Sequence, residues 1–303
     1  MGVDAVLIAG PTASGKSAAA LALAEHAHGV VINTDSMQVY REARILTARP
    51  NAEAEARAPH RLYGYVSIDE AYSVARYQAD AAAAFAAARA ENRLPIFTGG
   101  TGLYFGALTD GLANIPAVPV DIRNRVQGLR DEIGAEAFFE ALKTRDPESA
   151  ARLRASDTQR TLRAYEVFEA TGRPLGAWQQ DKPPLGPLAG LKLARFVIAP
   201  PRPELHRRID RRFDRMLEDG AVDEAVRLSS VDSSKPAAKI LGLRELQAVS
   251  TGAMAVDEAR STAQAQTRQY AKRQLTWFRH RMSDWRWLEP SGNFLTEIFT
   301  SVA

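Results

Sequence analysis

The chain has 303 residues, of which 46% are hydrophobic and 25% are charged, as in an average soluble globular protein. No apolar run approaches the roughly 20 residues that a membrane-spanning helix needs. A strand pattern begins almost at the N-terminus, which argues against a signal peptide. Cysteine is absent, so disulfides and thiolate metal sites are excluded. We expect a cytoplasmic protein with one large domain, or with a core domain and an insertion.

Positive charge is concentrated in the second half of the sequence, although the formal net charge is only +3. Residues 192–283 contain 18 basic and 11 acidic side chains, whereas residues 1–110 contain 9 basic and 11 acidic ones. Solvated, arginine-rich helices explain such a bias as well as a nucleic-acid surface does. Charge alone therefore leaves both interpretations open.

The first motif of the chain is a loop suited to phosphate groups. Residues 7–20 read LIAGPTASGKSAAA, an apolar run, a glycine-bounded loop and a stretch rich in alanine, as in a P-loop. Glycines let the backbone amides face phosphate oxygens, and the following helix directs its positive end at the anion. Lys16 adds a positive charge, and Ser17 adds a hydroxyl suited to Mg²⁺. The predicted phosphate-binding residues are Gly10, Pro11, Thr12, Ala13, Ser14, Gly15, Lys16 and Ser17.

The first 110 residues alternate between strand and helix patterns. The predicted elements are strands at 5–9, 29–35 and 94–100 and helices at 16–28 and 73–92. This alternation predicts a parallel sheet with right-handed crossovers. Ligands of such sheets bind beyond the carboxyl ends of the strands. We therefore expect the P-loop, Asp35 and the segment GGTGLYF at 99–105 to meet in one cleft.

Helical patterns dominate the rest of the chain, with one further strand. A helical insertion domain is expected at 121–184, ending in a segment rich in proline and glycine. LKLARFVIAP at 191–200 then restores a strand, and helices are predicted at 203–220, 221–229, 237–249 and 256–282. Residues 1–120 and 185–303 would form the core domain. The predicted fold class is α/β, a P-loop NTPase-like parallel sheet flanked by helices, with a helical insertion and a helical C-terminal part.

Several classes of P-loop protein fit these residues. A nucleotide hydrolase normally has a metal-binding carboxylate at the end of a second apolar strand, but LPIFTGG ends in Thr98 and glycines. An ATP-binding kinase for a small metabolite stays open, because Asp35 follows a strand where a general base could meet a hydroxyl. Asp35 could equally cap a turn. A non-catalytic RNA-binding module with a structural nucleotide is disfavoured by this acid in the cleft.

A series of colinear stretches resembles one family. They are GPTASGKS, NTDSMQVY, FTGGTGLYFGAL, DTQRTLRAYEVFEATG, RRIDRRFDRMLEDG, KILGLRE and AKRQLTWFR. From about residue 5 to residue 288 the chain is similar to the tRNA dimethylallyltransferases, also called isopentenyl-tRNA transferases. One departure is Gly242-Leu243, where that family often has Gly-Tyr. The resemblance implies that the P-loop holds dimethylallyl pyrophosphate instead of ATP. It also implies transfer of the prenyl group to the exocyclic amine of the adenosine 3′ of the anticodon.

The resemblance further implies roles for single residues and Mg²⁺ as the cofactor, near Ser17. Asp35 resembles the general base, Thr101 the residue that meets the target nucleotide, and Arg212 a residue that binds pyrophosphate. Without the resemblance, Arg212 would be read as part of a solvated helix face, because five arginines occur between residues 207 and 215. The implied tRNA contacts are Asp35, Ser36, Met37, Gln38, Thr101, Arg123, Gln159, Arg160, Thr161, Leu162 and Arg163.

Two acceptors stay open within this resemblance. The insertion would hold the anticodon stem-loop of tRNA, and a basic helix at 268–281 would add phosphate contacts. A related enzyme that prenylates free adenine nucleotides would not need the insertion and its arginines, which favours tRNA. The aromatic residues Tyr270, Trp277, Phe278, Trp285 and Trp287 could stack on bases, but we expect core packing. A monomer is expected.

Overall fold

The structure, a computed structural model, describes residues 2–181, 184–233 and 235–302, so residues 182 and 183 of the predicted insertion lie outside the described part. The chain divides into two compact units. The core unit comprises Met1–Thr109 and Pro187–Ala303, and the helical unit comprises Asp110–Gly186. The helical unit begins ahead of residue 121 because Gly111 packs directly on the returning chain. A Cβ at Gly111 would lie 1.8 Å from the carbonyl oxygen of Pro184.

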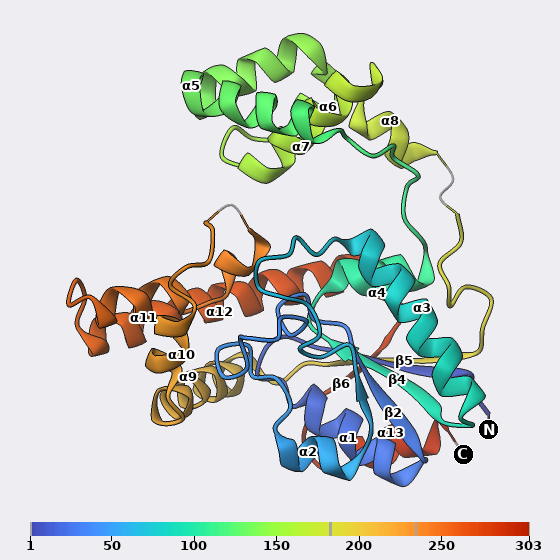
Figure 1. The fold of residues 1–303 in the computed structure, drawn as a ribbon. Coiled ribbons are helices and arrows are strands. Elements are labelled where there is room, and N and C mark those ends of the chain that lie inside the picture. Colours follow the sequence, from blue (N-terminus) through green and yellow to red (C-terminus); the bar gives the residue numbers. More distant parts are fainter. Residues whose placement is uncertain (1, 182–183, 234, 303) are drawn as a thin grey trace. The chain divides into compact units, whose positions relative to one another are not determined.

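A six-stranded parallel sheet forms the centre of the core unit, in the order β3-β2-β4-β1-β5-β6 (Figure 1). All residues of β1, β2 and β4 are buried, which explains why these strands read as continuous apolar runs. The two short edge strands were not predicted, since two or three residues give no periodic signal. The strands are β1 (Ala5–Ala9), β2 (Gly29–Asn33), β3 (His60–Arg61), β4 (Leu94–Gly99), β5 (Leu193–Ile198) and β6 (Arg286–Leu288).

Helices cover both faces of this sheet, as expected for the predicted fold class, which is confirmed (Figure 1). Alternate strand residues point to opposite faces. Leu7 and Ile32 pack with α3, α4 and α12, while Val6 and Ile8 pack with α1 and α13. The helices of the core unit are α1 (Lys16–His26), α2 (Ala52–Arg57), α3 (Val74–Ala90), α4 (Gly102–Thr109), α9 (Arg202–Glu218), α10 (Ala221–Arg227), α11 (Leu243–Ser250), α12 (Val256–Arg281) and α13 (Phe294–Thr300).

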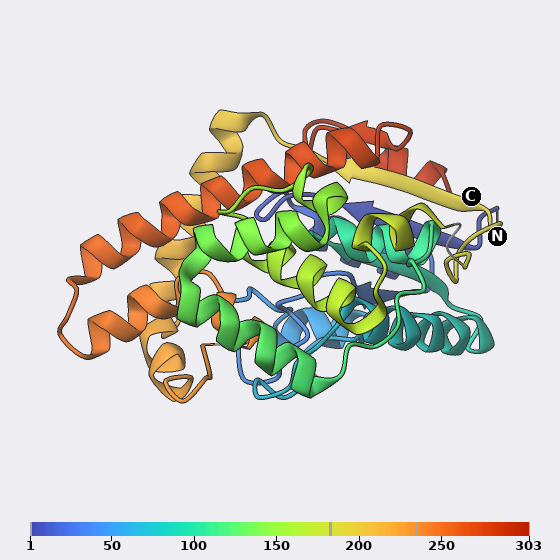
Figure 2. The ribbon, with the colours of Figure 1, turned by 90° about the horizontal axis from the view of Figure 1, so that it is seen from above.

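The helices after β5 form the C-terminal part of the core unit. The long α12 packs against both α9 and α11, and Figure 2 shows α11 beside it. The prediction of one helix over 237–249 is wrong, because this segment forms a 3-10 turn at Pro236–Lys239 and the separate helix α11. The break is at Gly242, whose φ of +82° lies in the left-handed region. A Cβ there would lie 2.9 Å from the Phe213 ring of α9.

Replacing Gly242 by alanine is expected to lower the free energy of unfolding by about 2–3 kcal/mol, the sum of a left-handed backbone and an overpacked contact. Gly252 is a matched control, because its φ is +75° and no heavy atom lies within 4 Å of the position that a Cβ would take there. Its alanine variant should lose only about 1 kcal/mol, the backbone contribution. Urea unfolding of both variants measures the difference, and equal losses would contradict the close approach to Phe213.

The helical unit has a core of its own, formed mainly by α5 and α7. Phe138 and Tyr165 pack at its centre, with ring centroids 4.9 Å apart. Gly134, at φ +79°, interrupts the helical backbone within α5 and produces a kink. Among the described residues, no helix of either unit has the length and apolarity needed to span a bilayer. Its helices are α5 (Val120–Arg145), α6 (Pro147–Ala150), α7 (Thr158–Thr171) and α8 (Leu175–Gln180).

Candidate active site

The P-loop connects the end of β1 to the start of α1. Gly15 precedes the helix with a φ of +93°, which glycine adopts readily. Gly10 is equally constrained, because a Cβ there would lie 2.5 Å from the Ser14 hydroxyl. The Lys16 Nζ donates to the carbonyl oxygen of Pro11 at 3.1 Å. The N-terminus of α1 and the Lys16 side chain therefore lie at the same loop, an arrangement that favours a phosphate group.

A cavity of about 310 Å³ lies against this loop. One part of its lining is polar and includes Thr12, Asp35 and Arg212. Another part is apolar and includes Ile209 and Phe213, on the same helix as Arg212. The cavity therefore presents an anion-binding end and an apolar wall to one ligand, within the usual size of small-molecule sites.

Asp35 lies directly after β2, in a turn that uses one of its two carboxylate oxygens. Its Oδ1 accepts from the Met37 amide at 2.9 Å, and its own amide donates to Asn33 Oδ1 at 2.8 Å. Its Oδ2 lies beside Gly100, where a Cβ would be 3.4 Å away. The turn-capping interpretation and the general-base interpretation are therefore compatible, because each uses a different oxygen.

Thr101 joins the exits of β2 and β4, as predicted for the cleft. Its hydroxyl oxygen accepts from the Ser36 amide at 3.0 Å and donates to the Ser36 hydroxyl at 3.3 Å. Its amide donates to the Thr34 carbonyl at 3.2 Å. Ser36 and Met37 line the cavity, while the side-chain Nε2 of Gln38 donates to the backbone carbonyls of Thr47 and Ala48. The segment 34–38 is thus held rigidly at the mouth of the sheet.

Arg212 reaches the P-loop from α9, although the two are 200 residues apart. Its Nη2 donates to the Thr12 hydroxyl. Burial lowers the pKa of Arg212 to about 10, and Asp35 opposes this shift, so the guanidinium stays charged at neutral pH. The structure separates Arg212 from the exposed arginines of the same helix, which are Arg202, Arg207, Arg211 and Arg215.

Lys16 has a pKa that burial lowers to about 8, with Asp35 opposing and Arg212 reinforcing the shift. A bound pyrophosphate favours the charged lysine and so raises this pKa. Pyrophosphate affinity should therefore fall as pH rises above about 8, and binding at about pH 9 should take up a proton. Calorimetry in buffers of different ionisation enthalpy measures this uptake. Subtracting the Lys16→Met variant removes the titration of pyrophosphate itself; no difference between the two would contradict the lowered pKa.

Gln274 and Tyr270, both on α12, lie at the site, although Gln274 was not singled out from the sequence and Tyr270 was expected to pack in the core. Gln274 is buried and hydrogen bonds to Thr12 and Gly100. Tyr270 lines the cavity instead of packing only in the core, and burial raises its pKa far above the usual range. The prediction of core packing is confirmed for Phe278 and Trp285, which are buried. A polar residue on the buried face of a helix was the available signal for Gln274.

The predicted tRNA contacts of the helical unit fall into two groups. Three are exposed, namely Arg123, Gln159 and Arg160. Thr161 and Leu162 face the interior of the unit, and the Thr161 hydroxyl donates to a backbone carbonyl at 2.9 Å. Arg163 is partly buried, and its Nη1 lies 3.6 Å from Oε2 of Glu166.

The described residues contain no group of three or more His, Cys, Asp or Glu side chains that could hold a metal ion. Mg²⁺ in phosphate sites needs no such group, since it keeps several waters and binds through one or two protein oxygens plus the substrate phosphates. Ser17 is exposed at the first turn of α1, next to Lys16. A single hydroxyl at a phosphate loop therefore fits Mg²⁺ that arrives with pyrophosphate.

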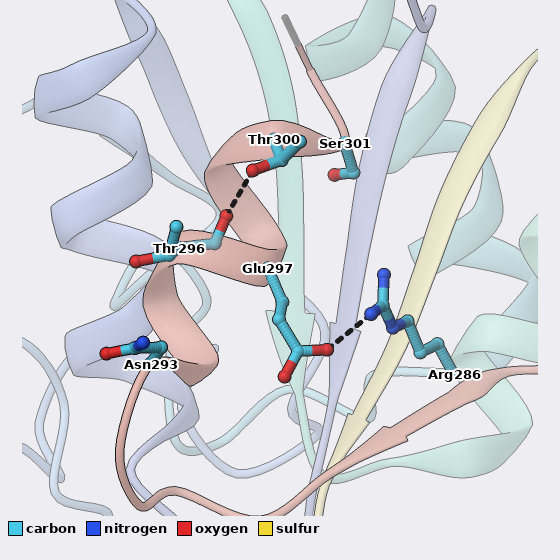
Figure 3. A pocket seen from close by; sticks show the side chains of 6 residues that line it. All are labelled: Arg286, Asn293, Thr296, Glu297, Thr300 and Ser301. Atoms are coloured by element: carbon cyan, nitrogen blue, oxygen red, sulfur yellow. Dashed lines mark hydrogen bonds and ion pairs between the residues drawn. The ribbon is translucent and has the colours of Figure 1, made fainter.

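A second cavity, of about 330 Å³, lies between β6 and α13 (Figure 3). Arg286 and Glu297 form an ion pair across it, and the Thr300 hydroxyl donates to the Thr296 carbonyl at 2.8 Å. It shares no lining residue with the cavity at the P-loop. Its charged groups satisfy each other, so the P-loop cavity is the candidate active site.

Comparison with known proteins assigns the family. The IPP transferase family matches residues 38–281, most of the chain. The chain belongs to the IPP transferase family. A tRNA dimethylallyltransferase of Methylobacterium radiotolerans is 52% identical over 97% of this chain and 96% of its own. One of Azorhizobium caulinodans is 54% identical over 93% of this chain and 90% of its own.

Solved structures of IPP transferases have the same fold. The tRNA isopentenylpyrophosphate transferase of Bacillus halodurans has a TM-score of 0.69 at 31% identity, covering 98% of this chain and 94% of its own. A eukaryotic dimethylallyltransferase, described as acting on tRNA, has a TM-score of 0.78 at 25% identity, over 94% of this chain and 73% of its own. The family match begins at residue 38, after the P-loop and Asp35, and it includes Arg212. Thr12 of the P-loop, Asp35 and Arg212 nevertheless line one cavity. This arrangement supports the family assignment independently of the matched residues.

Proposed function

We propose that this protein transfers the dimethylallyl group of dimethylallyl pyrophosphate to the exocyclic amine of the adenosine 3′ of the anticodon in tRNA, releasing pyrophosphate. The names of its relatives support this reaction class and this acceptor. The observation that carries the proposal is that Asp35 and Arg212 line one cavity against the P-loop. A base and an anion site are the two groups that such a transfer needs on opposite sides of the reacting carbon.

The chemistry follows from these positions. The amine nitrogen bonds to the allylic carbon, and the carbon–oxygen bond breaks with its electron pair left on pyrophosphate. Asp35 accepts the proton that the amine loses. Lys16, Arg212 and the amides of the P-loop stabilise the charge that builds on the leaving group. Mg²⁺ at Ser17, when bound, supplies further neutralisation of the pyrophosphate.

The helical unit supplies the tRNA contacts in this proposal. Its exposed Arg123, Gln159 and Arg160 suit the anticodon stem-loop, because positively charged and amide side chains bind phosphates and exposed base edges. The target adenine must leave the anticodon stack to reach a cavity, so a flipped nucleotide is expected. The basic helix α12 adds salt-dependent affinity. We include a monomer in the proposal, and also a cytoplasmic location, since tRNA is the substrate.

Radiolabelled dimethylallyl pyrophosphate tests the proposal directly. The purified protein is incubated with unmodified tRNA and Mg²⁺, with AMP and ATP in parallel and with Asp35→Ala as the control. Label in tRNA that depends on Asp35 supports the proposal. Label in AMP alone points to an enzyme that prenylates free nucleotides, and ATP hydrolysis without transfer points to a kinase-like function of the P-loop.

A further inference from the structure

Gln274 is a buried polar side chain in the middle of a basic helix. Its exposed fraction is 5%, whereas its neighbours Lys272 and Arg273 on α12 are exposed. An amide group has both donors and acceptors, and a buried one is costly unless they are satisfied. The position of its hydrogen bonds therefore shows what this residue holds in place.

Each end of the Gln274 amide binds a different loop of the candidate active site. Its Oε1 accepts from the Thr12 amide of the P-loop at 2.9 Å. Its Nε2 donates to the Gly100 carbonyl, after β4, at 2.9 Å. Tyr270, one turn earlier on α12, lines the cavity. One side chain thus connects the loop that faces pyrophosphate to the loop that precedes Thr101.

Gly100 packs closely against this amide. A Cβ at Gly100 would lie 2.2 Å from Gln274 Nε2 and 3.4 Å from Asp35 Oδ2. Gly100 therefore lies between the proposed base and the Gln274 amide. The Thr12 hydroxyl is in turn bound by Arg212. Movement of Gln274 would shift both Thr12 and the backbone against which Asp35 packs.

We propose that Gln274 is a positioning residue of the prenyl-transfer site, which fixes the spacing between the pyrophosphate side and the acceptor side of the cavity. This inference rests on the proposed function. Gln274 acts through Thr12 and through the Gly100–Thr101 backbone, which carry the contacts to the two substrates. Transfer between two bound substrates depends steeply on their separation, so the effect should appear in the rate of the chemical step.

The requirement for both a donor and an acceptor distinguishes positioning from simple core filling. Methionine has nearly the same length as glutamine but neither hydrogen bond. Glutamate accepts from Thr12 but, when ionised, cannot donate to Gly100. A protonated glutamic acid can do both, so a Gln274→Glu variant should regain activity as pH falls. A residue that only fills space would not give this pH dependence.

The test compares Gln274→Met and Gln274→Glu with Gln269→Met, which alters an exposed glutamine on the same helix. Single-turnover transfer to tRNA, pyrophosphate affinity and thermal unfolding are measured for each. Gln274→Met is expected to lower the single-turnover rate by about 10- to 100-fold and to weaken pyrophosphate binding, whereas Gln269→Met matches the wild type. The rate of Gln274→Glu is divided by the wild-type rate at each pH, which cancels the pH dependence that the two proteins share. This ratio is expected to rise as pH falls.

Transfer by Gln274→Met within about 2-fold of wild type would overturn the inference, as would a Gln274→Glu ratio that does not change with pH. If Gln274→Met does not fold, the pH dependence of Gln274→Glu decides. If the wild type binds pyrophosphate but transfers no prenyl group, the proposed function fails instead. In that case unchanged pyrophosphate affinity in Gln274→Met overturns the positioning role separately.

Discussion

Replacing Asp35 by asparagine is expected to slow prenyl transfer by about 10²- to 10⁴-fold, the usual contribution of a general base. Asparagine keeps the turn, because its side-chain oxygen can still accept from the Met37 amide, but its amide nitrogen cannot take a proton. Pyrophosphate affinity should stay equal or rise, since a negative charge that acts on both Lys16 and Arg212 is removed. Single-turnover transfer and calorimetric binding measure the two effects separately.

Slower transfer together with equal or higher pyrophosphate affinity identifies Asp35 as a base. A damaged site would instead lose both transfer rate and pyrophosphate affinity. Asp219→Asn is the control, since this exposed carboxylate follows α9 on the surface of the core unit. It should transfer at the wild-type rate. A rate for Asp35→Asn within about 10-fold of wild type, below the effect of a general base, would reduce Asp35 to the cap of its turn.

Local patterns were sufficient to predict the four central strands of the sheet and one side of the site. The P-loop motif has a fixed spacing, and the buried strands β1, β2 and β4 are continuous apolar runs. Because parallel strands end at one edge of a sheet, the position of Asp35 after β2 could be predicted from its place in the sequence. The meeting of Thr101 with Ser36 followed from the same rule.

Side chains that serve distant backbone groups could not be predicted in this way. Gln274 binds an amide 262 residues away, and Glu224 binds three amides near residue 45. Every buried amide needs a partner, but the sequence does not state which distant side chain supplies it. The break of the predicted helix at Gly242 has the same origin, because it depends on the approach of Phe213. Tertiary packing decides the partners of Gln274, the partners of Glu224 and the helix break at Gly242.

Replacing Glu224 by alanine is expected to lower the free energy of unfolding by about 3 kcal/mol or more, because three amides lose a charged acceptor. Glu224 lies on α10 with an exposed fraction of 2%. Its Oε2 accepts from the amides of Arg44 and Ile45, both at 2.9 Å, and its Oε1 accepts from Leu46 at 2.8 Å. Urea unfolding measures the loss, and hydrogen exchange at these three amides should show reduced protection.

The same substitution should also affect the reaction, since the segment that Glu224 holds forms a wall of the cavity through Leu46 and Thr47. Glu224→Gln keeps the volume and one acceptor, so it should retain part of the stability while raising KM for the substrates. Glu218→Gln, an exposed residue at the end of α9, is the matched control and should change stability by less than about 0.5 kcal/mol, as at other surface positions. An equally small change for Glu224→Ala would mean that the segment 44–47 holds its conformation without α10. The wall would then be an independent loop, and its amides would exchange at the same rate in the variant and the wild type.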